Sequence, residues 1–544
     1  MKQIARDLGR LLVGEITTDK QTREHFSVDA SVFKKEPRLV VYPKSERDVV
    51  LTVKYFDELA RAGTVIGITA RGRGTDKGGA ALGEGAMLVF PAHMNNLVEV
   101  SKRSITAQPG MVYSNLQGVL HSHGRFLPPY PASMHYSTIG GAVANNAAGE
   151  KSVKYGSTRD YVDSLRVVLS NGDVIETGRL SKRALAQKKQ QDDFEGDIYR
   201  QLDDLIEHNQ DVLSQARLAV SKNAAGYDLW DIKDKRGTFD LSQLIVGSQG
   251  TLGIVTEATL CHEAWNPHTI LLAGFFDSLD KAARAIESIL PLAPSALEVV
   301  DGHLLDYLRQ HKPEQIEGLV PESLPKMVLL VEFDNAKVKA RQKKAKSVAK
   351  IFKHYTYDSR YATDPEEQDA LWKISRGGAA VVLMNADSSK ALPIIEDVVV
   401  PLEKATELLD GAHALFRKYK IRATLWGHGG NANFHFQPFM NLSSPKDRSR
   451  ILDLTDEFYR LVIKLGGSTS GQHNDGILRA PYLKRLYGAR AYQLFEDVKR
   501  IFDPLGIFNP NVKIGVSEEH VAAKMRREYS LQRLHDYLPG HSTN

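Results

Sequence analysis

Cysteine is the residue this chain has least of, since Cys261 is the only one among 544 residues. A disulfide needs two thiols, so an intramolecular disulfide framework is excluded. Iron–sulfur clusters need about four thiolates and cysteine-rich zinc sites need several, so the chain forms neither from its own residues. Low cysteine content is typical of reducing compartments, and we expect a cytoplasmic location.

Long hydrophobic runs and an excess of one charge are also missing. Thr269–Phe276 is among the longest apolar runs, whereas a transmembrane helix needs about 18 such residues. Met1–Thr18 has no apolar core of signal-peptide type. We therefore expect no transmembrane segment and, at most, peripheral contact with a membrane. The net charge of +5 is weak for this length and does not indicate nucleic acid as a partner.

The composition that remains is that of an ordinary globular protein, with 42% apolar and 25% charged residues. Short strand-like runs, helices and glycine-rich turns fill the first half. Longer helical patterns that alternate with strand-like runs follow from about Trp265, which favours a second α+β or α/β unit. We predict a helical lead-in at 1–36, a first unit at 37–264, a second unit at 265–515 and a polar tail at 516–544.

Local patterns predict individual elements within these units. Ser45 precedes an apolar helical face and is the expected N-cap of a helix over 45–62. Asn171-Gly172 separates two alternating runs and predicts a β-hairpin. The remaining predictions are strands at 39–41, 64–69 and 327–333 and helices at 279–290 and 335–354.

Three glycine-rich segments lie in the first unit, at 71–79, 137–149 and 247–255. Glycine lets backbone N–H groups approach an anion or a flat ligand, and two arginines in the first segment would attract phosphate. A flexible loop and a small-residue helix are the alternatives for the first two segments. Lys77 interrupts a G-x-G-x-x-G pattern and no Walker motif is present, so a nucleotide would be held by several separate loops.

The order of these segments resembles the FAD domain of the vanillyl-alcohol oxidase / p-cresol methylhydroxylase superfamily. The first is similar to the family's Arg-Gly-Gly-Gly-Thr pyrophosphate loop, with Arg73 in place of a glycine. The second is similar to Thr-Ile-Gly-Gly…Asn-Ala-Gly-Gly with Ala148 for a glycine, and the third to Gly-Ser-Glu-Gly-Thr-Leu-Gly-Ile-Val with Gln249 for glutamate. Phe502-Asp503-Pro504 and Phe508-Asn509-Pro510 resemble the closing motifs of FAD-linked oxidases.

This resemblance implies an α+β, two-domain flavoprotein of the vanillyl-alcohol oxidase type. A split FAD-binding domain of p-cresol methylhydroxylase type would occupy 37–264, and an FAD-linked oxidase C-terminal substrate domain would occupy 265–515. The first loop has no histidine, so FAD is expected without a covalent bond. The implied cofactor-binding residues are Arg71, Gly72, Arg73, Gly74, Thr75, Asp76, Pro131, Ser137, Thr138, Gly140, Gly141, Ala144, Asn145, Asn146, Gly149, Tyr155, Gly156, Gly250, Gly253, Ile254, Val255 and Asn509.

Histidines mark the second unit. His428 and His435 would face opposite sides of a straight strand, but a turn between them would make them cross-strand neighbours. Two convergent imidazoles make half of a metal site, and ordinary hydrogen-bonded hairpin histidines are the alternative. His473 lies in a polar, turn-rich segment and is available as a base near neutral pH.

These segments resemble the C-terminal domain of FAD-linked oxidases of the glycolate / D-lactate / D-2-hydroxyglutarate dehydrogenase type. The resemblance implies His473 as the active-site base. It implies His428 and His435 as ligands of a divalent metal such as Zn, with Gln472 where metal-using members have glutamate. Leu371–Arg376 is similar to the segment whose arginine pairs with the substrate carboxylate, which makes Arg376 the candidate and Lys390 a weaker second. A surface ion pair is the alternative for Arg376.

The resulting prediction is an FAD-dependent dehydrogenase that oxidises a D-configured 2-hydroxy acid, such as D-lactate, glycolate or D-2-hydroxyglutarate, to the 2-oxo acid. The Gln-His-Asn-Asp-Gly version at 472–476 looks like a subgroup often fused to an iron–sulfur module. We therefore expect an external electron acceptor, which is a quinone, an electron-transfer protein or an iron–sulfur subunit. A homo-oligomer is compatible with the sequence. The alternatives are an oxidase that uses O₂, an FAD-binding subunit that needs a partner, and a zinc-dependent hydrolase.

Overall fold

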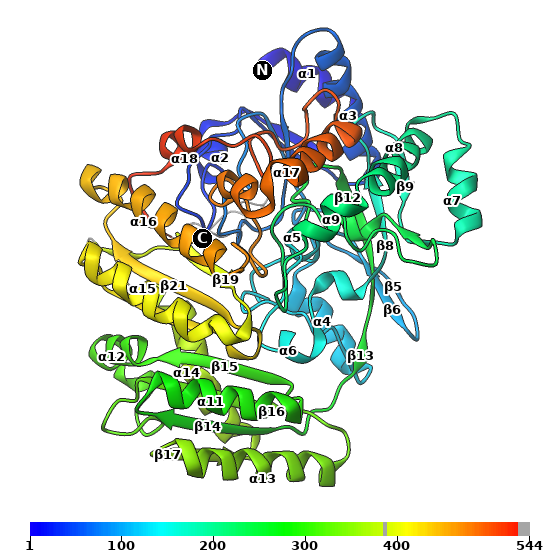
Figure 1. Cartoon of the computed structure of the whole chain (residues 1–544). Coiled ribbons are helices and arrows are strands. Elements are labelled where there is room, and N and C mark those ends of the chain that lie inside the picture. Colours follow the sequence, from blue (N-terminus) through cyan, green and yellow to red (C-terminus); the bar gives the residue numbers. More distant parts are fainter. Residues whose placement is uncertain (384–388, 531–544) are drawn as a thin grey trace.

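The chain folds into two units that lie one above the other in Figure 1, and the computed structural model describes residues 1–383 and 389–530. The upper unit contains two larger sheets and the lower unit contains one large sheet. Helices flank every one of these sheets, so the fold is α+β as the sequence predicts. No helix within the described residues is both long and apolar enough to cross a membrane.

The first sheet of the upper unit has the strand order β1-β2-β4-β3, in which β2, β4 and β3 run parallel. Helices α1 and α3 cover it through one apolar cluster that includes Leu8, Val53 and Val41. Ser45 caps α3 as predicted, because its Oγ accepts a hydrogen bond from the Asp48 amide. The elements are β1 (Glu15–Thr17), β2 (Leu39–Tyr42), β3 (Ile68–Arg71), β4 (Ala86–Val89), α1 (Lys2–Leu11), α2 (Lys20–His25) and α3 (Glu46–Arg61).

The second sheet is antiparallel, with the order β5-β6-β12-β8-β9. The predicted hairpin at Asn171-Gly172 joins β8 to β9, and Gly172 has the positive φ of 82° that this tight turn requires. The strands are β5 (Leu97–Val100), β6 (Ser104–Ala107), β8 (Val162–Val168), β9 (Val174–Glu176) and β12 (Ile254–Cys261), with two short pairs, β7 (Arg125–Phe126) with β13 (Glu263–Ala264) and β10 (Arg179–Leu180) with β11 (Phe239–Asp240). The helices are α4 (Tyr113–Ser122), α5 (Ile139–Asn145), α6 (Ser152–Tyr155), α7 (Lys182–Lys189), α8 (Phe194–His208), α9 (Gln210–Ala216) and α10 (Ser242–Ile245).

The lower unit is one antiparallel sheet with the order β17-β14-β16-β15-β20-β21-β18, and β19 also pairs with β21. Its central strands are buried on both faces, since alternate residues of β14 and β16 join two different apolar clusters. Helices α11, α13, α15 and α16 cover one face, and α12 and α14 cover the other. The strands are β14 (Ile270–Phe276), β15 (Ala296–Asp301), β16 (Met327–Phe333), β17 (Asp358–Ala362), β18 (Lys390–Ala391), β19 (Ile395–Val399), β20 (Ala423–His428) and β21 (Asn433–Met440). The helices are α11 (Leu279–Ile289), α12 (Gly302–His311), α13 (Val338–Tyr355), α14 (Pro365–Leu383), α15 (Ala405–Tyr419) and α16 (Pro445–Lys464).

The C-terminal segment returns to the upper unit. Helix α17 (Leu483–Phe502) lies against α8 and α9, as both views show, and Phe508 then pairs with Ile68 beside β3. The short helix α18 (Glu518–Lys524) follows. Side chains of α17 such as Leu483 and Phe495 pack in an apolar cluster of the first unit, whereas Val512 and Val516 belong to the cluster that includes the lower sheet. The boundary expected at residue 515 stays a prediction.

Two element boundaries differ from the sequence prediction. The strand expected at 64–69 is β3 at Ile68–Arg71, because the Thr64 amide bonds back to the Leu59 carbonyl and closes the preceding helix. The helix expected at 335–354 starts at Val338, because the Asn266 side chain holds the carbonyl of Asn335. The strand β16 at Met327–Phe333 and the start of α11 at Leu279 are as predicted.

Candidate functional site

The three glycine-rich segments of the upper unit converge on one place. The Asn145 amide nitrogen donates to Asp76 Oδ1 at 3.0 Å, and the Asn145 amide oxygen accepts from Gln249 Nε2 at 2.9 Å. Gln249 Oε1 accepts from the Gly476 amide at 2.9 Å. One hydrogen-bonded chain therefore ties the first, second and third segments to the turn that follows His473.

Asn509 closes the same arrangement from the C-terminal segment. Its amide nitrogen donates to the carbonyls of Ala80 at 2.9 Å and Gln249 at 2.8 Å, and its amide oxygen accepts from Thr69 Oγ1 at 3.0 Å. Asn509 is fully buried and has a positive φ of 40°. Its contacts hold the loops in place, so its role is to position them.

Glycine is required at two positions here because atoms of neighbouring segments lie too close for a Cβ. A Cβ on Gly72 would meet Thr138 Oγ1, and a Cβ on Gly149 would meet the carbonyl of Tyr130. Asp76 shapes the first loop, because its Oδ2 accepts from the amides of Gly78 at 3.0 Å and Ala80 at 2.8 Å. The loops thus expose backbone rather than side chains, which is what a flat, phosphate-bearing ligand needs.

The second segment carries a polar atom that is ready for a ligand. Ser137 Oγ is buried and has no hydrogen-bond partner among the described residues. Next to it, Thr138 caps α5 by accepting from the Gly141 amide at 3.2 Å, and Asn146 ends α5 in the left-handed conformation. The unpaired hydroxyl and the exposed backbone fit the predicted FAD site.

Arg71, which is expected to attract phosphate, also makes contacts within the protein. Its guanidinium donates to the carbonyls of Val28 at 2.8 Å and Ala81 at 3.2 Å and lies over the Phe26 ring. These contacts fasten the N-terminal segment to the loop. Gly74 beside it has a φ of 71°, and Arg73 is half-buried in the same loop.

The other predicted cofactor residues surround this centre. Tyr155 donates its hydroxyl to Asp334 of the lower unit at 2.6 Å. Gly250 has a positive φ of 67°, and Gly253 lies against Val167 in the second sheet. The remaining members lie in the same three loops or next to them: Thr75, Pro131, Gly140, Ala144, Gly156, Ile254 and Val255.

The histidines of the lower unit gather around a buried carboxylate. His473 Nδ1 lies 2.8 Å from both oxygens of Glu396, and His435 Nδ1 lies 3.4 Å from Glu396 Oε2. Arg479 donates to Glu396 Oε1 at 2.6 Å, and the ammonium of Lys77 lies 3.5 Å from Oε2. Although burial alone would raise the pKa of Glu396, its interactions with the His473 imidazole and the Lys77 ammonium hold that pKa well below its usual value.

The geometry leaves one nitrogen of His473 available. Its Nδ1 is engaged by Glu396, so Nε2 is the nitrogen that can take a proton, and a carboxylate in this position stabilises the resulting imidazolium. The His473 side chain is 22% exposed, against 3% for His435, so it is the one that a ligand reaches. Burial lowers the pKa of His435 to about 4, so that ring is neutral at pH 7.

Asp397 fixes the backbone of the His473 segment. Its Oδ2 accepts from the amides of Gln472 at 2.9 Å and His473 at 2.6 Å and from Ser470 Oγ at 2.6 Å. Burial alone would raise the pKa of Asp397, but the neighbouring histidines and Arg479 lower it to about 2. Asp397 also has a φ of 67°, a strained conformation of the kind that persists at functional sites.

His428, His435 and Gln472, the predicted metal ligands, lie together but are already engaged. In the β20–β21 hairpin Trp426 stands opposite His435, so His428 falls on the same face, with the two ring centroids 5.5 Å apart. The Lys222 ammonium donates to Gln472 Oε1 at 2.6 Å, and Gln472 Nε2 lies 3.0 Å from His428 Nε2. Since the amide nitrogen is a donor, His428 Nε2 accepts, and its Nδ1 donates to Glu298 at 2.8 Å.

This chain of bonds does not fit a metal ion at the predicted set. The Gln472 oxygen holds an ammonium, and the His428 lone pair that a metal needs accepts a hydrogen bond. Lys222 lies in the interior, where burial lowers its pKa to about 8, so it remains largely charged at pH 7 and repels a second cation. A different group, Glu396, His435 and His473, has donor atoms within 4.8 Å of one another, but Arg479 and Lys77 already neutralise that carboxylate.

The predicted carboxylate partners lie on the lower unit. Arg376 on α14 contacts Glu150 of the upper unit at 3.3 Å, lies over the Trp372 ring and is 55% exposed. Burial raises the pKa of Glu298, the residue that accepts a hydrogen bond from His428, and the positive charge of Arg376 opposes this rise. Lys390 lies in the short strand β18 opposite Met440.

Sequence reasoning missed several members of this site. Glu396 and Asp397 belong to none of the motifs described above, and the available signal was a pair of adjacent acids in the otherwise apolar stretch at 392–401. Lys222 and Glu298 carry no motif, because they come from a loop and a central strand far away in the chain.

Comparison with known proteins agrees with this arrangement. Residues 37–178 match the family described as FAD binding domain, and residues 266–512 match FAD linked oxidases, C-terminal domain. The chain belongs to the FAD-linked oxidase family and is an FAD-dependent oxidoreductase.

Relatives include the glycolate oxidase subunit GlcD of Bacillus subtilis, 29% identical over 481 residues that cover 86% of this chain and 89% of the relative. A D-2-hydroxyglutarate dehydrogenase of Pseudomonas putida is 26% identical, with 91% of this chain and 50% of the relative covered. The mitochondrial D-lactate dehydrogenase [cytochrome] of Arabidopsis thaliana is 27% identical, with 94% and 79% covered. The chain therefore spans about half the length of the Pseudomonas relative.

Solved structures confirm the fold. A 4-ethylphenol oxidase from Gulosibacter chungangensis has a TM-score of 0.70 at 16% identity, covering 95% of this chain and 98% of that one. An alkyldihydroxyacetonephosphate synthase has a TM-score of 0.64 at 17% identity, covering 94% and 84%. The predicted two-domain fold of the vanillyl-alcohol oxidase type is correct.

Proposed function

We propose that this protein oxidises a D-configured 2-hydroxy acid, of the size of glycolate, D-lactate or D-2-hydroxyglutarate, to the 2-oxo acid. The observation that carries the proposal is the Glu396–His473 pair, a base with one free nitrogen beside the convergent glycine loops. The named activities of the relatives, which all concern 2-hydroxy acids, support the same substrate class.

His473 takes the proton of the substrate hydroxyl at Nε2. Glu396, bonded to Nδ1, orients the ring and stabilises the positive charge that forms. The hydrogen on the hydroxyl-bearing carbon leaves with its electron pair, and the carbon–oxygen bond becomes a carbonyl. The three loops would hold FAD without a covalent bond, and the bound flavin would provide the acceptor for that hydrogen and its two electrons.

Arg376 binds the substrate carboxylate. Within the part of the chain that the structure describes, Glu150 accepts the one side-chain hydrogen bond from the Arg376 guanidinium, so further N–H donors can hold a carboxylate in a bidentate fashion. Lys390 is proposed as a second cation for the same group or, with longer substrates, for a second carboxylate. Together they place the hydroxyl-bearing end of the substrate toward His473.

The proposal does not need a metal at His428, His435 and Gln472. The Lys222–Gln472–His428–Glu298 chain holds the His428 ring neutral and fixed, and burial keeps its pKa well below the usual value. Neutral imidazoles beside the hydroxyl oxygen can polarise it by hydrogen bonding. A zinc-dependent hydrolase leaves the FAD family membership unexplained.

An anaerobic reduction experiment tests the function. The flavin-loaded protein is mixed with a panel of D- and L-2-hydroxy acids, and the loss of flavin absorbance is followed. Reduction by at least one D-isomer is expected. His473→Gln should retain FAD and slow reduction by about 10²- to 10⁴-fold, the usual contribution of a general base. Protein that takes up no FAD would refute the proposal, and an unchanged rate in the variant would refute the role of His473.

A second candidate is a subunit that reduces its flavin but turns over only with a partner. The relative from Bacillus subtilis is named as a subunit, and the single cysteine cannot build an electron relay within this chain. Steady-state turnover with an artificial quinone but little peroxide in air would favour a dehydrogenase with an external acceptor. Stoichiometric peroxide would favour an oxidase.

A further inference from the structure

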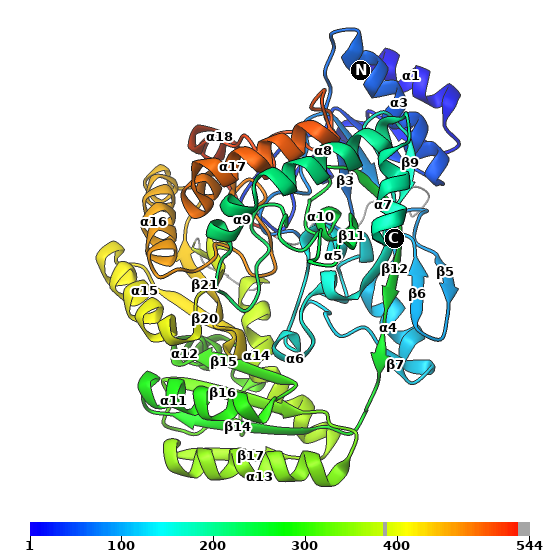
Figure 2. The ribbon, with the colours of Figure 1, turned by 45° about the vertical axis from the view of Figure 1, so that its right-hand side comes forward.

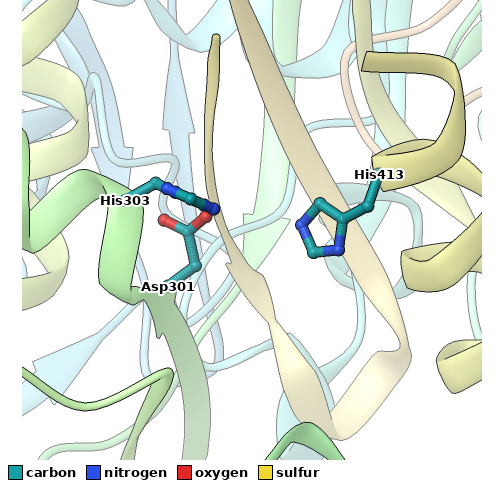
Figure 3. A group of neighbouring side chains, drawn as sticks. All are labelled: Asp301, His303 and His413. Carbon is teal, nitrogen blue, oxygen red and sulfur yellow. The ribbon is translucent and has the colours of Figure 1, made fainter. Parts of the chain in front are cut away.

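Two histidines and a buried aspartate meet at the far end of strand β15, outside the flavin site. Asp301 is the last residue of β15, His303 follows it in α12, and His413 reaches them from α15. Their ligand atoms all lie within 4.8 Å of one another. Figure 3 shows His303 beside the Asp301 carboxylate, with the His413 ring facing them from the opposite helix.

This cluster is distinct from the Glu396 centre. Side chains alternate along a strand, so Asp301, three residues beyond Glu298, projects from the opposite face of β15. Glu298 contacts His428, whereas Asp301 lies near α15. None of the residues proposed for catalysis belongs to the second cluster.

Asp301 is a buried carboxylate that lacks a cationic partner. Its Oδ1 accepts from the amides of Leu304 at 2.9 Å and Leu425 at 3.2 Å, which caps α12 and holds the side chain in place. Among the described residues it forms no salt bridge, although it is only 4% exposed. A buried carboxylate with no salt-bridge partner favours a nearby cation.

The two histidines are suited to bind such a cation. His413 is partly buried, and each imidazole offers one ring nitrogen to the group of ligand atoms. The ring centroids of His303 and His413 lie 6.1 Å apart at an interplanar angle of 72°. Two imidazoles with one carboxylate form a donor set that suits zinc and related ions.

A cavity of about 520 Å³ opens beside the cluster and is lined by both histidines. Arg417, Lys420 and Arg422 also line it, together with one acid, Asp306, so the lining carries more positive than negative side chains. A fourth ligand can therefore enter from the cavity, and the surrounding cations favour water, hydroxide or a small anion in that position.

We propose that Asp301, His303 and His413 form a binding site for a divalent transition metal of the zinc class, separate from the flavin site and open to the cavity at its fourth position. In a tetrahedral site with bonds of about 2.0–2.1 Å, ligand atoms lie about 3.3 Å apart. Rotation of the two imidazoles closes the separation of up to 4.8 Å, and His303 is exposed and has room to rotate.

Metal uptake by the tag-free, flavin-loaded protein tests the site. After chelator treatment, Zn²⁺ is titrated by calorimetry and Co²⁺ by its visible absorption. Wild type should bind one more equivalent than His303→Ala or His413→Ala. His311→Ala, an exposed histidine on the same helix that bonds to its own backbone, serves as the control and should bind like wild type. His435→Ala identifies any ion bound at the Glu396 centre.

A thermal measurement gives a second readout. Zn²⁺ should raise the melting temperature of wild type and the His311 variant but not that of the His303 variant, which changes an exposed side chain and is expected to fold. The proposal is overturned if wild type and both cluster variants bind the same number of equivalents. An equal shift in melting temperature in all proteins would also overturn it.

Discussion

At the scale of single residues, the site is organised by two buried carboxylates. Glu396 contacts Nδ1 of His473, and Asp397 accepts hydrogen bonds from the backbone amides of Gln472 and His473. Both acids keep a low pKa because histidines and basic side chains surround them. Both carboxylates therefore fix the position of His473, the residue proposed as the base.

The Lys222–Gln472 contact predicts that the reaction is insensitive to metal removal. Dialysis of the flavin-loaded protein against a chelator should leave the anaerobic reduction rate within about twofold of the untreated rate, because His428 Nε2 and Gln472 Oε1 are occupied by hydrogen bonds. The same treatment should lower the melting temperature through the Asp301 cluster. A rate that falls on chelation and returns with Zn²⁺ would place a metal in the mechanism.

The buried neutral His435 predicts a pH dependence of stability. Its pKa is about 4 when folded, against about 6.5 in the unfolded chain. Between these values the unfolded chain binds the extra proton, so stability falls as pH decreases from 6.5 toward 4, by an amount on the order of 3 kcal/mol. His435→Gln should therefore lose less melting temperature than wild type between pH 7 and pH 5.

The exposed His354 on α13 provides the control for this measurement. His354→Gln should behave like wild type. Identical pH dependence in wild type and His435→Gln would show that His435 does not titrate as a buried neutral ring.

At the scale of elements, the sequence correctly predicted the features that depend only on neighbouring residues. The Ser45 cap, the Asn171-Gly172 hairpin and strand β16 follow from neighbouring residues, and the structure confirms them. The starts of β3 and α13 were missed because bonds from outside the local pattern shift them. The glycine loops were located by sequence, but their convergence depends on Asn145, Gln249 and Asn509.

The hydrogen bonds of Asn509 predict that this residue contributes to the affinity for FAD. Asn509→Ala removes hydrogen bonds to two loops, each worth about 1 kcal/mol, so the dissociation constant of FAD should rise by about tenfold or more. The measurement is fluorescence titration of the FAD-free protein. Asn511→Gly, at an exposed position that also has a positive φ, is the matched control and should bind FAD like wild type. Equal affinity in both variants would contradict the role of Asn509.

At the scale of the whole molecule, the site forms where the two units meet. Lys151 pairs with Glu332, Lys154 and Tyr155 contact Asp334, and Arg376 contacts Glu150, all across the same boundary. These contacts hold the lower unit against the glycine-rich segments of the upper unit. In the proposed function, the residues that bind substrate and the loops that bind FAD come from separate halves of the chain.

Arg376 makes this arrangement testable. Arg376→Met should raise the KM for the 2-hydroxy acid by about 10- to 100-fold, the value of a lost charged hydrogen bond, with a smaller effect on FAD content. Arg284→Met, which removes an exposed pair with Asp280 on α11, is the control and should leave KM unchanged. If the KM of Arg376→Met is unchanged, Arg376 does not bind the substrate and forms only a surface ion pair with Glu150.

The sequence by itself determined the family, the cofactor class and the segments that carry function, because glycine loops and histidine motifs are local patterns with specific chemistry. Only the tertiary structure decided which residues from distant parts of the chain contact those segments. It brought Lys222 to Gln472, Glu298 to His428 and Glu396 to His473, and it carried α17 back to the first unit. Such contacts join residues far apart in the chain, and burial then sets their charge, which no local pattern encodes.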